Sequence, residues 1–396
     1  MILDWAKADA AQRTGPSDHE AKHWNDTLTV NLWIASPMMA GYSFVKQRIT
    51  VPEEEDQIIK DWFKKIVKKN PNATDVTKKL LRNKKEIITE NKSKVGWYIR
   101  KDINIEFIKT NHHNPNYISS INLNTKQLKI SSNINEVIVD ADILIIAIPS
   151  AFISSEFAKI DTSINEKIIF TAVKGVVPQS MLIVGKHLHE KYKVPYEKIG
   201  VITGPCHAEE VAMERLSFLT VACSNTNLAK VIALMLKTKY IRTKISNDII
   251  GTEYASMLKN IYAIAAGIAH SIGYGDNFQS VLMSNAIREM KRFIKDVYNF
   301  KRNINNSAYL GDLLVTSYSV FSRNRTFGSM IGKGYSVKAA QTEMQMIAEG
   351  YYATKSAKII NSDYPTRIPI IDAVFSILYE GKNADKVFKK LVKKLD

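Results

Sequence analysis

The sequence predicts an α/β fold, a doubly wound parallel sheet, followed by an all-α C-terminal domain. Short β-branched runs alternate with helical patterns in the middle of the chain, as in a parallel sheet that is covered by helices on both faces. After Gly251 the strand signals stop and only helical patterns follow. The length of 396 residues also exceeds one ordinary core and favours more than one domain.

The expected strands are short and almost continuously apolar, which is typical of strands buried on both faces. They are residues 95–100 (VGWYIR), 143–149 (ILIIAIP), 167–173 (KIIFTAV), 199–203 (IGVIT), 218–223 (FLTVAC) and 240–245. Before them, residues 28–35 alternate like a strand, while the charged stretches 53–69 and 75–91 indicate helices.

The expected helices of the C-terminal half begin with residues 252–272, which are apolar almost all round and predict a helix buried inside a helical domain. Further helices are expected at about residues 280–298, 336–362, 368–379 and 384–395. The last has an apolar face opposite a row of lysines, and a docked terminal helix is favoured over a membrane-surface helix. We therefore expect three regions: an atypical N-terminal segment at 1–90, an α/β domain at 91–247 and a helical domain at 248–396.

Composition limits the class of protein. The net charge of +16 comes mostly from dispersed lysines without interleaved aromatic residues, so it favours a solvated surface or an anionic small substrate over nucleic acid. Two cysteines provide neither a disulfide framework nor a cysteine-rich zinc site. No apolar run approaches the roughly 20 residues that span a bilayer, and we expect a cytoplasmic protein without a membrane span or metal.

Two strand ends carry residues suited to ligand binding, because ligands of open parallel sheets lie beyond the carboxyl ends of the strands. Lys174 follows one strand and can meet an anion, although a strand-end lysine is often only solvated. Residues 203–209 (TGPCHAE) end another strand and open a helix at 208–215, where Gly204 allows close backbone approach. A plain turn explains this stretch equally well, and a metal or nucleophile role for Cys206 and His207 has little support.

The helical half offers a lysine and a basic cluster. Lys259 lies in the apolar helix with no acid three or four residues away, so it needs a distant partner or a lowered pKa, and such lysines transfer protons near neutral pH. A lysine that reaches the surface is the weaker alternative. Asp312 is expected either to pair with Lys259 or to bind a substrate hydroxyl. Arg323 presents a planar fork that matches phosphate, with donors from Ser322 and Asn324, unless these are ordinary loop residues.

Ten segments together resemble the bacterial-type NAD(P)-dependent glycerol-3-phosphate dehydrogenases, in order and spacing, over about residues 94–355. They are VGWYIR, HNPNYISS, IAIPSAF, VKG, GPCHAEE, GTEYASMLKNIYAIAAGI, GYGDNFQS, LGDLLVT, SRNRTFG and MIAEG. The resemblance implies a Rossmann-like dinucleotide-binding domain at 91–247 and a substrate-binding domain at 248–396. It also implies NAD or NADP as cofactor, a homodimer, and interconversion of dihydroxyacetone phosphate and sn-glycerol 3-phosphate for glycerophospholipid synthesis.

The same resemblance implies roles for individual residues. Lys259 would match the residue that exchanges the proton of the C2 hydroxyl. The implied substrate-binding residues are Lys174, Gly204, Cys206, Asp312, Ser322, Arg323 and Asn324, and the implied cofactor-binding residues are Arg100, Lys174, Ala208, Arg323, Ile347 and Glu349. Cys206 replaces a small hydroxyl residue of the family, so its hydrogen bond to the substrate would be weaker.

The N-terminal part departs from the family pattern. The glycine-rich turn that holds the cofactor pyrophosphate is expected near residues 72–77, which read Asn-Ala-Thr-Asp-Val-Thr. Only Gly15 and Gly41 precede Val95, so no G-x-G-x-x-G is present. Two classes of function therefore stay open: a dehydrogenase with an unorthodox cofactor site, and a non-catalytic relative that keeps the substrate-side residues.

Overall fold

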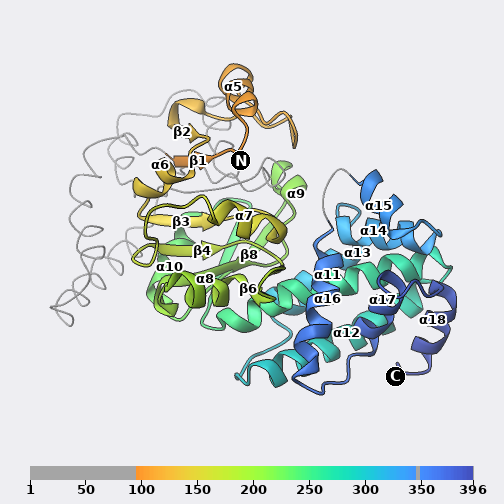
Figure 1. Cartoon of the computed structure of the whole chain (residues 1–396). Coiled ribbons are helices and arrows are strands. Elements are labelled where there is room, and N and C mark those ends of the chain that lie inside the picture. The colour runs from red at the N-terminus through yellow and green to blue at the C-terminus, as the bar shows by residue number, and fades with distance from the viewer. Residues whose placement is uncertain (1–94, 345–347, 396) are drawn as a thin grey trace.

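The structure, a computed structural model, describes residues 95–344 and 348–395 (Figure 1). It consists of an α/β part, which contains the sheet, and a helical part that follows it in the chain. The sequence predictions for residues 28–35, 53–69, 72–77 and 75–91 lie outside the described residues.

The main sheet has five strands in the order β3-β4-β7-β8-β9. Their bounds are Ile143–Ile146, Ile168–Thr171, Ile199–Thr203, Ser217–Cys223 and Ile241–Ser246. Every neighbouring pair is parallel except β7 and β8, which run antiparallel, so the predicted all-parallel pairing is wrong at this pair. The connection between them carries only the short helix α9 (Ala208–Ala212), which does not provide the crossover that parallel strands need.

A second pair of strands extends the same layer. β1 (Val95–Tyr98) and β2 (Leu128–Ser131) are parallel to each other and form a separate sheet among the described strands. Trp97 of β1 belongs to the same apolar cluster as Ile145 of β3, whereas Tyr98 belongs to the cluster of Ile146 on the opposite face. The faces of β1 therefore match those of β3. A short antiparallel hairpin joins β5 (Val176–Val177) and β6 (Leu182–Ile183).

Helices cover this sheet, as the alternating sequence pattern predicted (Figure 1). Besides α9 they are α5 (Asp102–Asn111), α6 (Ile134–Val139), α7 (Ile153–Phe157), α8 (Val184–Tyr192) and α10 (Thr226–Leu236). α10 contacts β8 and β9, and α8 contacts β7. Asn225 caps the start of α10 by accepting hydrogen bonds from the backbone amides of Asn227 and Leu228.

The helical part is built around α11 (Ile249–Ser271), which is buried along nearly its whole length, as predicted for residues 252–272. α11 contacts α12 (Asp276–Val297), α13 (Asp312–Tyr318), α14 (Arg323–Gly332), α16 (Glu349–Ser362) and α17 (Pro369–Leu378). The terminal helix α18 (Ala384–Val392) packs against α17, which confirms a docked helix. None of the described helices has both the length and the apolar character needed to cross a membrane.

The backbones of α11 and α14 approach each other closely at glycines. A Cβ on Gly328 would lie 2.1 Å from the carbonyl oxygen of Ile264, and a Cβ on Gly267 would lie 2.1 Å from that of Arg325. A larger residue at either position therefore cannot fit without moving a helix. Because Gly332 meets Ile268 in the same way, the two helices run in the same direction, and the start of α14 lies level with the middle of α11.

The predicted helix over residues 336–362 is wrong, because the chain forms two helices there. α15 (Val337–Glu343) is followed by Met344 and α16 is preceded by Ala348, and both flanking residues have an extended backbone. The amide of Gly350, in the first turn of α16, donates to Asn324 Oδ1 at 2.8 Å. This amide bonds to α14 and so does not need a preceding helical turn.

Candidate active site

A pocket lies where loops beyond β3, β4 and β7 meet the helical part. Seven of the predicted site residues line it: Lys174, Ala208, Lys259, Ser322, Arg323, Asn324 and Glu349. Its other lining residues are Tyr117, Ile148, Pro149, Val173, His207, Glu209, Asn260, Thr316 and Phe321. Segments far apart in the sequence thus converge at the place that the strand ends predicted.

A buried ion pair joins Lys259, which lines this pocket, to Asp312, which is not among the lining residues. Lys259 Nζ pairs with Asp312 Oδ1, and the two side chains are 3% and 1% exposed. The second carboxylate oxygen of Asp312 accepts a hydrogen bond from Thr203 Oγ1 at 3.2 Å. Of the two expectations for Asp312, the structure shows the pairing with Lys259, which supplies the distant partner that a buried lysine needs.

The surroundings shift the pKa values of this pair. Burial, assisted by the positive charge of Lys174, lowers the pKa of Lys259 to about 7, although Asp312 opposes the change. Burial opposes ionisation of Asp312 as well, but the charges of Lys259 and Lys174 hold its pKa below the ordinary value. The carboxylate is therefore charged while the amine is able to gain and lose a proton near neutral pH.

One face of α11 carries polar side chains that bond to residues of the α/β part. Glu253, Ser256 and Asn260 are spaced by three and four residues and therefore share this face. In the same order they bond to Gly185 N at 3.1 Å, Thr203 Oγ1 at 2.6 Å and Lys174 O at 2.8 Å. The sequence pattern, apolar almost all round, gave Asn260 no role in the site, although its spacing from the other two residues was a usable signal.

The start of α14 is suited to an anion. Ser322 is the N-cap residue, and its hydroxyl accepts a hydrogen bond from the amide of Arg325 at 3.3 Å. Arg323 and Asn324 follow in the first turn and line the pocket with it. A helix start provides amide donors and a positive dipole end, and a guanidinium adds a full charge. This arrangement fits a phosphate group.

The turn after β7 places its residues differently from the sequence prediction. Gly204 has a φ of +121°, and a Cβ there would lie 2.6 Å from the carbonyl oxygen of Phe218, so this position requires glycine. Cys206 is buried, and burial raises the pKa of its thiol to about 12, which leaves it a neutral, unreactive group. Neither residue is among those that line the pocket.

His207, in contrast, does line the pocket, and sequence reasoning gave it little weight. Burial and the nearby charges of Lys174 and Lys259 lower its pKa to about 4, so the ring is neutral near pH 7. Its Nδ1 is buried without a hydrogen-bond partner among the described residues. Those residues also contain no group of three or more His, Cys, Asp or Glu side chains arranged to hold a metal ion.

The residues with implied cofactor roles do not all lie in the pocket. Glu349 accepts hydrogen bonds from the backbone amide of Ser150 at 2.9 Å and from the Ser150 hydroxyl, which ties the start of α16 to the loop after β3. Arg100 lies outside the pocket, over the ring of Phe152 at 4.7 Å and 3.7 Å from a carboxylate oxygen of Glu156. Ile347 lies outside the described residues.

Comparisons with known proteins show which family the chain matches. The family model for the N-terminus of NAD-dependent glycerol-3-phosphate dehydrogenase matches residues 85–229, and the model for its C-terminus matches residues 248–389. The NAD(P)⁺-dependent glycerol-3-phosphate dehydrogenase of Macrococcus caseolyticus is 32% identical over 308 residues, which cover 77% of this chain and 92% of the relative. The enzyme of the same name from Bacillus subtilis is 31% identical over 309 residues, 77% of this chain and 89% of the relative.

Solved structures share the fold. The glycerol-3-phosphate dehydrogenase of Coxiella burnetii aligns with a TM-score of 0.73 at 21% identity and covers 92% of this chain and 99% of that one. The enzyme of Plasmodium falciparum aligns with a TM-score of 0.72 at 18% identity and covers 93% and 96%. The predicted α/β fold with an all-α C-terminal part is confirmed.

Proposed function

The chain belongs to the family of NAD-dependent glycerol-3-phosphate dehydrogenases, and from this premise we propose that Lys259 is its proton-transfer residue. The activity is the interconversion of dihydroxyacetone phosphate and sn-glycerol 3-phosphate with NAD or NADP. The family relationship favours this activity over a non-catalytic relative. The observation that supports Lys259 is that it lines the pocket while its amine pairs with the buried carboxylate of Asp312.

Each residue of the site has a separate role in the proposed reaction. The ammonium group of Lys259 gives its proton to the C2 oxygen as dihydroxyacetone phosphate is reduced, and the neutral amine takes it back in the reverse direction. Asp312 holds the amine in place and stabilises its charged form. Arg323, with Ser322 and Asn324, binds the phosphate and thereby places C2 near Lys259. In this assignment Gly204 and Cys206 shape the substrate turn, and Lys174 adds positive charge.

The described residues fit the nicotinamide end of a dinucleotide. Lys174, Ala208, Arg323 and Glu349 line the same pocket as Lys259 and would hold the cofactor beside the substrate. When bound, the nicotinamide supplies or accepts the hydride at C2. Arg100, which lies outside the pocket, would contact the adenosine ribose. Ile347 keeps its cofactor-binding role as part of the same proposal.

The proposal also covers the roles of the domains, the oligomeric state and the place of the protein in the cell. Residues 91–247 would bind the dinucleotide and residues 248–396 the substrate, whereas the role of residues 1–90 stays unassigned. The family resemblance supports a homodimer. It also supports a place in the cytoplasm and a role in supplying glycerophospholipid synthesis.

Replacement of Lys259 tests the central assignment. Lys259→Ala should lower kcat for dihydroxyacetone phosphate reduction by about 10²-fold or more, the usual contribution of general acid–base catalysis. Lys338→Ala, on the exposed face of α15, serves as the matched control. Near-normal turnover by a folded Lys259→Ala variant would remove Lys259 from this role.

A further inference from the structure

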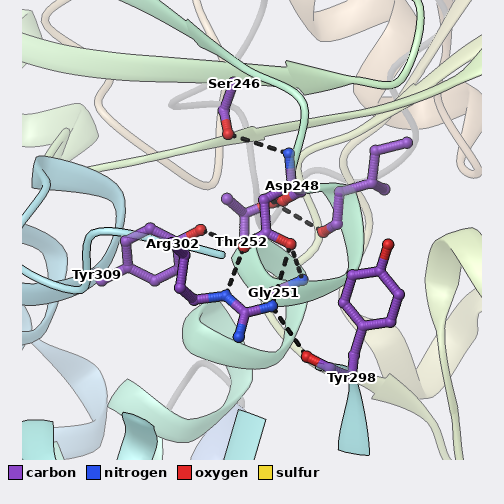
Figure 2. Close-up of polar contacts among 8 residues, drawn as sticks. Ser246, Asp248, Gly251, Thr252, Tyr298, Arg302 and Tyr309 are labelled. Atoms are coloured by element: carbon purple, nitrogen blue, oxygen red, sulfur yellow. Dashed lines mark hydrogen bonds and ion pairs between the residues drawn. The ribbon is translucent and has the colours of Figure 1, made fainter. Parts of the chain in front are cut away.

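The carboxylate of Asp248 binds three partners at the base of α11 (Figure 2). Its side chain is buried, with Asp248 2% exposed. Asp248 Oδ1 accepts the amide of Gly251 at 3.0 Å and thereby caps α11. Asp248 Oδ2 accepts Arg302 Nε at 2.7 Å and the hydroxyl of Tyr309 at 2.6 Å. The second guanidinium nitrogen of Arg302 reaches the carbonyl of Tyr298 at 3.1 Å, so the arginine is itself fixed.

Two of these partners, Gly251 and Tyr309, belong to the segments that carry Lys259 and Asp312. Gly251 is in the first turn of α11, and Lys259 lies about two turns further along the same helix. Tyr309 is in the π-helical turn η6 (Ser307–Gly311), which continues directly into α13, whose first residue is Asp312. A single carboxylate thus bonds to both segments, outside the pocket itself.

We infer that Asp248 and Tyr309 are positioning residues for the pair formed by Lys259 and Asp312. The hydrogen bond from Tyr309 holds η6 against the base of α11, and this contact fixes how closely the Asp312 carboxylate approaches the amine. The inference rests on the proposed role of Lys259. It assigns a function to a network that lies outside the pocket and contacts neither substrate nor cofactor in the proposed mechanism.

The electrostatics of the pocket make this distance important. Asp312 faces Lys259 from α13, while the charge of Lys174 faces it from the loop after β4. His207, Arg323 and Glu349 line the same pocket from other elements. Attraction between charges in a dry site falls steeply when they separate, so withdrawal of Asp312 leaves burial and Lys174 to dominate. The protonated form of Lys259 then loses stability.

Tyr309→Phe removes one hydroxyl and leaves the bonds of Asp248 to Gly251 and Arg302 in place. We expect the limb of the pH–kcat profile that reports Lys259 to move to lower pH by about one unit, because an opposite charge has withdrawn. The limb should move the same way for reduction and oxidation. The KM for dihydroxyacetone phosphate should change by less than about twofold, because the residues assigned to the phosphate are untouched.

A second readout does not depend on activity. Acetylation of the Lys259 amine by dilute acetic anhydride across a pH series, followed by peptide mass spectrometry, gives its pKa in the protein alone. The same downward shift is expected in Tyr309→Phe. If the labelling pKa shifts but the wild-type protein shows no turnover, the proposed function fails and the inference stands.

Tyr379→Phe is the matched control. The hydroxyl of Tyr379 also donates a partly buried hydrogen bond in the helical part, to the carbonyl of Tyr351 at 2.7 Å. It should leave the labelling pKa of Lys259 unchanged. A folded Tyr309→Phe with an unchanged labelling pKa would overturn the inference and leave Asp248 a purely structural clamp. If Tyr309→Phe does not fold, Asp248→Asn takes its place under the same criterion, since the amide oxygen still caps Gly251.

Discussion

In the proposed function, Arg323 is the residue that recognises the substrate phosphate. Arg323→Lys keeps a positive charge but loses the planar fork that bonds two phosphate oxygens. The KM for dihydroxyacetone phosphate should rise by about tenfold or more, the effect of losing one hydrogen bond to a charged group. Initial-rate measurements with the phosphorylated substrate test this. Arg325→Lys, two residues along α14 and outside the pocket lining, is the control. Equal use of unphosphorylated dihydroxyacetone by the wild type would contradict the phosphate assignment.

Individual site residues were predictable where one residue type in its local setting carried the signal. Lys259 was identifiable because no acid lies near it on its own helix. Its partner Asp312 is 53 residues away, so sequence left pairing and hydroxyl binding equally open. His207 was undervalued because its neutral state depends on the charges of Lys174 and Lys259, which only the folded chain brings near.

At the scale of secondary structure, two buried glutamates cap helices that belong to other segments. Glu289 of α12 accepts the amides of Ile370 and Ile371 at 2.8 and 3.1 Å, at the start of α17. Burial raises its pKa to about 8 despite these bonds. Burial likewise raises the pKa of Glu253, which caps α8, to about 7. Both helix starts therefore bond to carboxyl groups that hold protons more tightly than in the unfolded chain.

This shift predicts the pH dependence of stability. At Glu289 and Glu253 the native state binds more protons than the unfolded state between about pH 4.5 and pH 8, so the contribution of these two groups to the free energy of unfolding should fall as pH rises through that range. Glu289→Gln keeps an oxygen acceptor and removes the titration, which should flatten the fall. Urea unfolding at several pH values measures it, with the exposed Glu343→Gln as control. An equally steep fall in Glu289→Gln would contradict the assignment.

The secondary structure was largely predictable because strands and helices that are buried on all sides consist of nearly continuous apolar residues. The apolar runs became strands of the sheet, and the apolar stretch after Asp248 became α11. Two features depended on contacts between segments. The first turn of α16 forms where Gly350 bonds to Asn324, and the antiparallel strand β8 follows the short helix α9. No local pattern encodes either contact.

At the scale of the whole molecule, the chain combines a substrate side typical of the family with an N-terminal sequence that has no glycine fingerprint. We expect it to bind NADH or NADPH much more weakly than a relative with G-x-G-x-x-G. Each lost charge-assisted bond to the pyrophosphate costs about 1.5–3 kcal/mol, and Asp75 adds a negative charge. Titration by nicotinamide fluorescence measures the affinity. A chimera with a strand and a glycine-rich turn before Glu86 should bind tightly, whereas low-micromolar affinity of the unaltered chain would contradict the prediction.

The contact between Glu349 and Ser150 would couple the protonation of Glu349 to any separation of the helical part from the α/β part. Glu349 belongs to the helical part and Ser150 to the α/β part. A separation of the two parts would therefore break these hydrogen bonds and expose the Glu349 carboxyl group to water. Burial raises the pKa of Glu349 while this contact is formed. Such a separation would release a proton from Glu349, so acid would favour the contact and alkali would oppose it.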